Sequence, residues 1–256
     1  MISHHPLQGA LDRIDWAEKR MADLKGQIHA YGKRYADAVT VQPDARQATG
    51  FRAIYPSAAV SAIPTQISIL VGEVIYNLRA ALDYLAFELA LLDSGKMQDF
   101  TQFPVCDSPE KFAKKRASDL KGFNQIHVAT IEALQPYRGC DWTRRLQEIS
   151  NPDKHQRLTE RGSSVAVEVM MPGYTYRASD PAQNLFVTKR VAKGADGVEV
   201  DVQLVTSVIV SIPIKHSGMV IGQPVEELLH KIQAGARHAI ESFAGDFDGV
   251  HKPPHE

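Results

Sequence analysis

The sequence predicts an α+β fold: a helical bundle around one long central helix (about 65–92), an antiparallel β-meander (about 163–214) and a C-terminal helix. Changes in the spacing of apolar residues predict it. Apolar residues recur every three or four positions in the first half of the chain and again in 224–243, which is typical of amphipathic helices. Between these segments the spacing is two, which is typical of strands with one buried face.

We expect residues 1–250 to form a single domain, because the sequence contains no internal repeat and no low-complexity linker. The helical part of this domain covers about 1–160, and the β-rich part about 161–222. The helix 224–243 closes the domain, and residues 251–256 should form a mobile tail.

Composition excludes several classes of protein. Of 256 residues, 44% are hydrophobic and 23% are charged, the proportions of an ordinary globular protein. The net charge of −1 provides no overall field for nucleic acid or an anionic membrane, and two cysteines are too few for a disulfide scaffold. The chain shows no signal-peptide pattern, and its longest apolar stretch, 63–92, is interrupted by charged residues. We therefore expect a cytoplasmic protein that does not enter a membrane.

The first half of the chain is predicted to be mainly helical. A helix is expected over 7–35, and two short β-favouring runs at 38–41 and 51–55 predict a hairpin. The next helix should run from about Thr65 to Leu92. Because it is apolar on nearly all sides, we expect it to be the most buried element.

Three shorter helices are predicted next. Ser108 is a favourable N-cap, and Pro109 can begin a helix that ends near Ser118. A second helix should span about 123–134. A third should span 141–150, where the following Asn-Pro pair is expected to end it.

The β-rich part is predicted from alternation. Strands are expected at 165–171 and 185–192, followed by a glycine-containing hairpin loop at 193–197. From Val198 to Ile214 the apolar residues fall on even positions. This segment should therefore be one long bent strand, or two strands in register.

Polar residues on the central helix are the first candidates for function. Glu73, Asn77 and Tyr84 fall near one face, and Arg79 and Asp83 form an i,i+4 pair on a neighbouring face. Because an unpaired buried charge is strongly destabilising, these groups need partners. They form either a structural network that fixes the register of neighbouring helices or part of a functional site.

A second polar segment, Asn151–Arg157, lies in the basic stretch 111–161, which holds 11 Lys and Arg against 6 Asp and Glu. His155 can change charge near neutrality, and Lys154 and Arg157 can hold a phosphate. The alternative interpretation is a capping turn whose basic side chains lie in solvent.

We expect the two polar groups of residues to meet. A helix break at Asn151 would let the chain fold back on the central helix, and Asp153 would then offer Arg79 a planar carboxylate partner. If that pair is buried, replacing Arg79 should strongly destabilise the fold.

Three motifs resemble those of a family of uncharacterised bacterial proteins. The central helix reads Asn77-Leu78-Arg79-Ala80-Ala81-Leu82-Asp83-Tyr84-Leu85, which is similar to an N-L-R-x-A-L-D-H-L helix. Gln135-Pro136-Tyr137 and Asn151-Pro152-Asp153-Lys154-His155 are similar to the QPY and N-x-D-K-H-R motifs of that family. The resemblance covers about residues 60–160.

The helix motif is in turn similar to the Arg-x4-His signature of HEPN domains, all-helical modules of RNA-cleaving toxins and defence proteins. That similarity implies a homodimer that cleaves RNA without a metal ion. Arg79 matches the arginine of the signature, whereas Tyr84 stands where the signature has histidine. His155 could replace the missing histidine if its segment folds back.

Two functions therefore remain open. The first is a non-catalytic binding or scaffold protein with a protein partner, in which Asn77, Arg79 and Asp83 form a structural network. The second is a HEPN-like ribonuclease. In it, Arg79 stabilises the charge of the phosphorane, His155 or Tyr84 transfers protons, and Lys154 and Arg157 hold the RNA backbone.

We expect neither a cofactor nor a metal ion. The sequence contains no phosphate-binding loop, dinucleotide fingerprint, HExxH or paired CxxC motif, and Glu227-x-x-His230 has no second such pair. The environment of Arg79 should discriminate between the two functions. An Arg79 sealed against Asp83 favours the structural network, and an Arg79 open to one cleft with His155 favours the ribonuclease.

Overall fold

The computed structural model describes residues 5–43, 51–55, 62–153, 164–170, 184–194, 197–216 and 219–249. For 151–153, 164–170, 213–216 and 219–221 it describes the backbone alone. The predicted tail 251–256 lies outside the described residues.

The chain forms two compact units. Unit 1 consists of Met1–Ala22, Leu70–Leu158 and Ile214–Glu256, and unit 2 consists of Asp23–Ile69 and Thr159–Pro213. The predicted α+β class is confirmed, with long helices near both ends of the chain and small antiparallel sheets.

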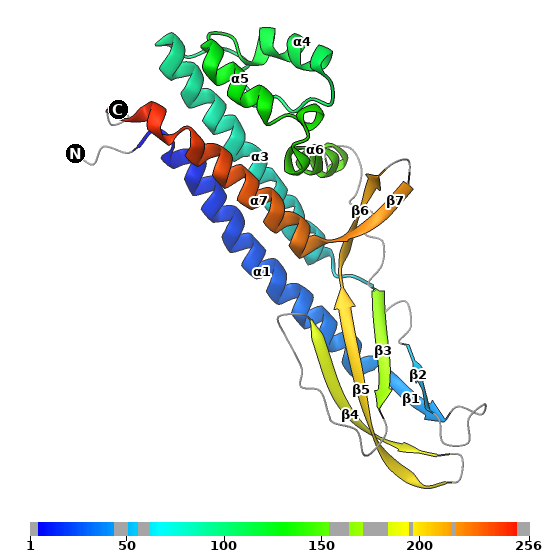
Figure 1. The fold of residues 1–256 in the computed structure, drawn as a ribbon. Coiled ribbons are helices and arrows are strands. Elements are labelled where there is room, and N and C mark those ends of the chain that lie inside the picture. The colour runs from blue at the N-terminus through cyan, green and yellow to red at the C-terminus, as the bar shows by residue number, and fades with distance from the viewer. Residues whose placement is uncertain are drawn as a thin grey trace. The chain divides into compact units, whose positions relative to one another are not determined.

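Unit 1 is mainly helical (Figure 1). It contains the first half of α1 (Gln8–Ala38), most of α3 (Thr65–Ser94), α4 (Pro109–Asp119), α5 (Gln125–Ala133), α6 (Asp141–Asp153) and α7 (Val225–Ser242), with the short 3-10 helices η1 (Pro136–Arg138) and η3 (Ala244–Phe247). The helices predicted from apolar spacing are all present, with ends that differ by a few residues.

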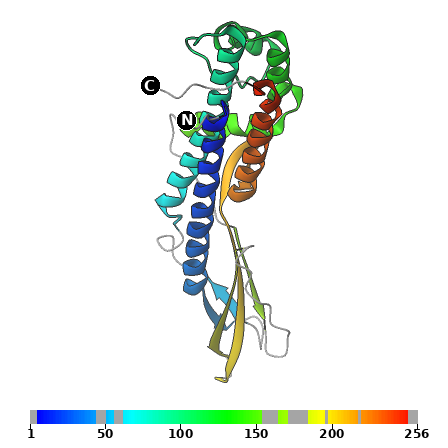
Figure 2. The ribbon, with the colours of Figure 1, turned by 90° about the vertical axis from the view of Figure 1, so that its left-hand side faces the viewer.

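In unit 1, α1, α3 and α7 run side by side, and α1 lies between the other two in the view of Figure 2. Arg237 on α7 donates to Asp15 on α1 over 2.6 Å. The predicted buried stripe of α7 is confirmed, because Val225, Leu229 and Ile232 are all buried. These apolar stripes form the core of unit 1.

The helix α3 supplies much of that core, as predicted, but it is not covered on all sides. Leu78, Leu82 and Leu85 are fully buried, whereas the side chains of Tyr76 and Tyr84 are 65% and 43% exposed. Most of the apolar surface is therefore on one side of α3, and the two tyrosines remain partly open to solvent.

The two capping signals in the sequence behave as predicted for α4, while α6 is longer than expected. Ser108 accepts from the backbone N–H of Lys111, and Pro109 occupies the first helical position. The helix α6 continues through Asn151 and Pro152 to Asp153, so the prediction that it ends at residue 150 is wrong. A proline in the last turn removes one backbone hydrogen bond and leaves the preceding turns intact.

Two antiparallel sheets of unit 2 contain the predicted strands. The predicted hairpin is formed by β1 (Thr40–Pro43) and β2 (Phe51–Ile54). The strands β3 (Ser164–Met170), β4 (Leu185–Lys193) and β5 (Glu199–Ile209) form the second sheet in the order β3-β5-β4, rather than the sequential order of a meander.

The strand β5, the longest of the three, occupies the centre of that sheet, and the middle of the strand is buried on both faces. Its even positions Val202, Leu204 and Val208 are buried as predicted, and Gln203 and Val205 on the opposite face are buried too. A strand covered on both faces is more stable with both edges paired.

In unit 2, a close approach between α1 and the sheet requires glycine at one position of the helix. A Cβ atom at Gly32 would lie 2.5 Å from the ring of Phe186 on β4 and 3.3 Å from Val208 on β5. Any larger residue at this position would push the helix away from the sheet.

Beyond β5 the predicted long strand continues as β6 (Ser211–His216), which pairs with β7 (Met219–Pro224). The strand β7 was not predicted, because its apolar run is short and is followed by glycine and proline. Among the described residues, no helix is long and apolar enough to span a membrane.

Candidate functional site

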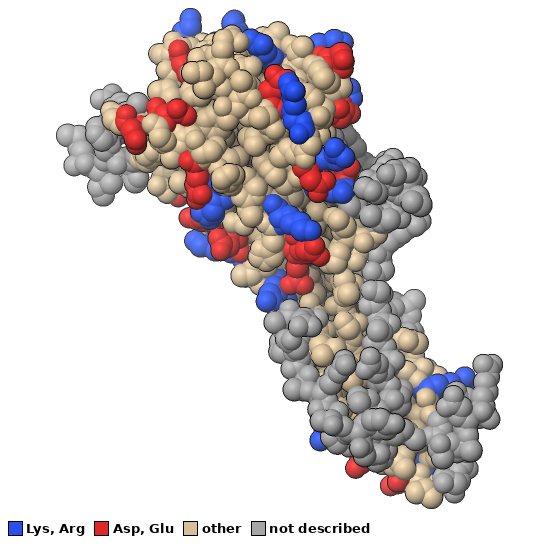
Figure 3. Space-filling view, in the orientation of Figure 1, with Lys and Arg blue, Asp and Glu red and all other residues tan. Residues whose placement is uncertain are grey.

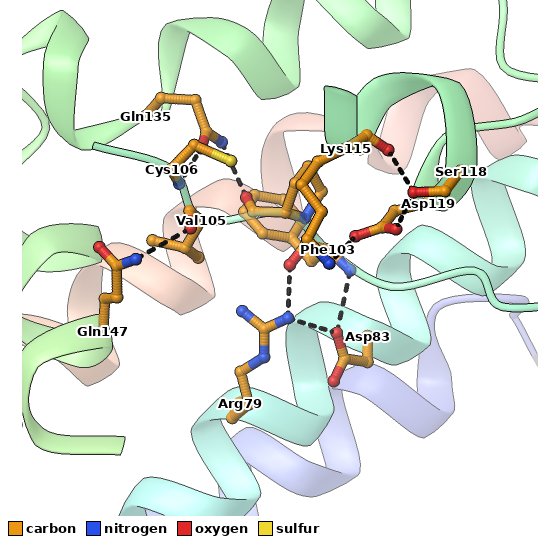
Figure 4. Close-up of polar contacts among 11 residues, drawn as sticks. Arg79, Asp83, Phe103, Val105, Cys106, Lys115, Ser118, Asp119, Gln135 and Gln147 are labelled. Carbon is orange, nitrogen blue, oxygen red and sulfur yellow. Dashed lines mark hydrogen bonds and ion pairs between the residues drawn. The ribbon is translucent and has the colours of Figure 1, made fainter. Parts of the chain in front are cut away.

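Arg79 and Asp83 on α3 hold the loop that connects α3 to α4. Arg79 Nη2 donates to Asp83 Oδ1 over 3.0 Å and to the backbone carbonyl of Phe103. The backbone N–H of Phe103 donates to the same Asp83 oxygen over 2.9 Å. Arg79, Asp83 and the backbone of Phe103 form a closed arrangement (Figure 4). In it, the i,i+4 pair predicted from the sequence binds both the N–H and the C=O group of Phe103.

Two glutamines hold the next residues of the same loop. Gln135 is completely buried; its Oε1 accepts from the backbone N–H of Cys106 over 2.8 Å, and its Nε2 donates to the carbonyl of Pro104 over 2.9 Å. Gln147 on α6 donates to the carbonyl of Val105 over 3.1 Å. Each residue from 103 to 106 is thus bonded to a side chain from another part of unit 1 (Figure 4). The loop is therefore fixed in one conformation.

A cavity of about 390 Å³ lies between α3, this loop, α4 and α6. Its lining consists of Tyr76, Arg79, Ala80, Asp83, Tyr84, Gln102, Phe103, Pro104, Val105, Lys115, Asp119, Gln147 and Ser150. This volume falls within the usual range of ligand pockets. The cavity is the candidate functional site.

The charged groups of the lining are paired with each other. Arg79 and Asp83, whose side chains are 25% and 33% exposed, form one pair, and Lys115 lies 3.2 Å from Asp119 in a second. Asp119 also accepts from the Ser118 hydroxyl over 2.6 Å. The charges of the lining therefore cancel, and no imidazole occurs among the described residues that line it.

Tyr84 lines the cavity and packs on the start of α1. The Arg13 guanidinium lies over its ring at 5.4 Å from the centroid. A Cβ atom at Gly9 would lie 3.0 Å from the ring, so α1 and α3 are in close contact there. Tyr84, the residue in the histidine position of the HEPN signature, therefore contacts α1 and lines the cavity.

Asn77 belongs to the interface between α1 and α3 and does not line the cavity. Its Oδ1 accepts from Arg13 Nη1 over 3.2 Å, and its Nδ2 donates to the carbonyl of Glu73 over 2.8 Å. Arg13 therefore links Asn77 to Tyr84. Arg13 could not be identified from the sequence, because nothing distinguishes it from the other polar residues of an amphipathic helix.

The second predicted group of residues is described only in part. Ser150 on α6 lines the cavity, and the backbone of 151–153 continues the helix. The side chain of Asp153, and all of Lys154, His155 and Arg157, lie outside the described residues. The expected contact between Arg79 and Asp153 therefore stays a prediction.

A separate polar cluster, which was not predicted from the sequence, surrounds Asp93 at the end of α3. Asp93 Oδ2 accepts from the backbone N–H of Asn124 and lies 2.8 Å from His127 Nδ1; its Oδ1 accepts from Asn124 Nδ2. His127 Nε2 lies 3.4 Å from Asp246 in η3, and Phe243 contacts the ring edge-on. The side chains of His127 and Asp93 are 6% and 4% exposed, so the contact between them is closed to solvent, whereas Asn124 and Asp246 lie at the surface.

The QPY motif also has a structural role beyond Gln135. The Tyr137 hydroxyl donates to Glu132 over 3.0 Å, and its burial, together with Glu132, raises the pKa of Tyr137 to about 12. Hydrogen bonds from Arg138 and Tyr137 lower the pKa of the Glu132 carboxyl. Burial raises the pKa of the Cys106 thiol, which disfavours the reactive thiolate.

Among the described residues, no group of three or more His, Cys, Asp or Glu side chains could hold a metal ion. No family model, no curated protein and no solved structure matches the chain. The cavity and its contacts are therefore the basis for any functional argument.

Proposed function

We propose that the protein is a non-catalytic binding module and that its ligand occupies the cavity beside α3. The observation that carries this proposal is the pairing of both cations of the lining, Arg79 and Lys115, with carboxylates of the same lining. The side chains of Arg79, Gln135 and Gln147 also hold the loop in place. A preformed cavity with neutralised charges suits binding without chemistry.

A metal-independent ribonuclease is the second candidate, and one observation favours it. The second terminal amino group of Arg79, Nη1, points away from Asp83 (Figure 4) and makes no hydrogen bond within the described part of the chain. It could donate to a phosphate. Against this function, Nη2 is engaged by Asp83 and Phe103, and a tyrosine does not supply the near-neutral proton transfer of an imidazole.

A photo-crosslinker placed in the cavity tests the binding function. Benzoylphenylalanine would replace Tyr76 in one variant and Ile126 in a control; Ile126 is 76% exposed on α5 and does not line the cavity. After irradiation in an extract of cells that naturally express the protein, we expect discrete adducts at position 76 that are absent at position 126. Identical adduct patterns at both positions would overturn the assignment of the cavity as the binding site.

A further inference from the structure

We infer that the ligand of the cavity is an extended polypeptide segment of a partner protein. This inference rests on the proposed binding function and names the chemical class of the ligand. Three features of the lining carry it: its neutralised charges, its unpaired neutral polar groups, and the spacing of its two exposed tyrosines.

The charges of the lining argue against a polyanion. Proteins bind nucleic acids mainly through Lys and Arg side chains that are free to neutralise phosphates. Here Arg79 and Lys115 are each neutralised by a carboxylate within the cavity. In the view of Figure 3, the basic and acidic side chains of the described residues are interspersed, so these residues form no extended basic path to a nucleic acid there.

The neutral polar groups of the lining match a peptide backbone. The side-chain amide of Gln102 and the hydroxyls of Tyr76 and Tyr84 line the cavity and make no hydrogen bond to any other described residue. An amide both donates and accepts, as does a phenol. An extended peptide presents alternating N–H and C=O groups that need such partners when they leave water.

The tyrosines are spaced to contact side chains about four residues apart in an extended ligand. Tyr76 and Tyr84 are two turns apart on α3, about 12 Å along the helix axis, with the small Ala80 between them. An extended chain covers that distance in about four residues. A ligand side chain, preferably apolar, can therefore lie over Ala80 between the two rings, and tyrosine is enriched in protein interfaces because it combines a large apolar area with a polar end.

The fixed loop lowers the cost of binding such a segment. Phe103, Val105 and Cys106 are already held by α3, Gln147 and Gln135, so this wall of the cavity loses little conformational entropy when a ligand binds. The ligand, Gln102 and the exposed tyrosine side chains still need to become ordered.

Selection from a random peptide library displayed on phage, with the full chain as the target, tests the inference. A selected peptide would be synthesised with a fluorophore, and its Kd measured by anisotropy for the wild type, for Tyr76→Ala and for the control Ile126→Ala. We expect Tyr76→Ala to weaken binding about tenfold or more, as for a central aromatic residue of an interface. Ile126→Ala should leave Kd unchanged. Because Tyr76 is exposed, its replacement should not impair folding.

A second arm of the same assay uses fluorescent single-stranded RNA. We expect peptide binding that changes little with added NaCl, and no RNA binding that depends on Tyr76. Salt-sensitive RNA binding that Tyr76→Ala weakens would overturn the peptide inference, as would selected peptides whose affinity does not depend on Tyr76, or failure to select any. If position 76 still forms specific crosslinks in these cases, the binding function stands and only the ligand class is wrong.

Discussion

The two polar clusters on α3 use similar residues and differ in how completely their hydrogen bonds are satisfied. Around Asp93, each carboxylate oxygen accepts from Asn124, and both oxygens are closed to solvent with His127. Around Arg79, the guanidinium is engaged on one side by Asp83 and Phe103 and is open to the cavity on the other. The buried contact between Asp93 and His127 stabilises the fold, whereas the cluster around Arg79 stabilises a loop and retains groups that a ligand can use.

The largest effect on stability should follow from opening the cluster around Asp93. In Asp93→Ala, Asn124 and His127 lose their buried acceptor, and the free energy of unfolding should fall by about 3–5 kcal/mol. Urea denaturation followed by circular dichroism measures it. Asp246→Ala is the matched control, because this more exposed carboxylate lies 3.4 Å from the other nitrogen of His127 and should contribute less than about 1 kcal/mol. Equal losses in both variants would show that the buried Asp93 contributes no more to the free energy of unfolding than the more exposed Asp246 does.

A smaller loss is expected where a buried side chain holds the loop. Gln135→Ala leaves the backbone groups of Pro104 and Cys106 without partners inside the protein, which should lower the free energy of unfolding by about 2–3 kcal/mol. Gln147→Ala removes a single, partly exposed hydrogen bond and should lower it by about 0.5–1 kcal/mol. The same denaturation measurement ranks the two variants, and the reverse order would contradict the account of the loop.

Arg79→Ala should lower the free energy of unfolding by an intermediate to small amount. Because Arg79 and Asp83 remain partly exposed, their ion pair is screened, and we expect a loss of about 1–2 kcal/mol, mainly from the contact with Phe103. Arg79→Lys should recover part of this loss, since an ammonium cannot span Asp83 and the carbonyl as a guanidinium does. Complete recovery by lysine would mean that charge alone matters at this position.

The smallest predicted effect is a dependence of stability on alkaline pH. The pKa of Tyr137, raised to about 12, lies above its ordinary value near 10, so the folded state favours the protonated phenol. This contribution is fully present below about pH 10 and is lost as the pH rises to about 12. Tyr137→Phe keeps the ring beside Phe112. In this variant the urea concentration at the midpoint of unfolding should fall less steeply with rising pH than in the wild type. If the urea midpoint of the variant falls with pH as steeply as that of the wild type, Tyr137 is not the source of the pH dependence.

The helices could be predicted from the sequence because their apolar stripes face a common core. The stripe of α7 and the capping pair Ser108-Pro109 are local signals, and both were interpreted correctly. The strand order could not be predicted, because alternation identifies a strand such as β5 without identifying its neighbours. The end of α6 was missed because Asn-Pro is a frequent but not obligatory stop.

The candidate site was predicted only in part. Arg79, Asp83 and Gln135 were singled out from the sequence, yet their common partner, the loop 103–106, has no pattern of its own. Contacts between a loop and distant helices depend on tertiary packing, and the spacing of residues within one helix carries no information about that packing. The pair Lys115 and Asp119 could have been found, since it has i,i+4 spacing on a predicted helix.

Cleavage of single-stranded RNA tests the central claim most directly, when it is measured with the wild type and Arg79→Ala at matched folded concentrations in the presence of a chelator. If Arg79 holds the loop of a binding module, the wild type should cleave no RNA, and Arg79→Ala should differ from it only by its lower unfolding free energy. Cleavage by the wild type that disappears in Arg79→Ala, with the stability unchanged, would contradict the account and assign Arg79 to catalysis.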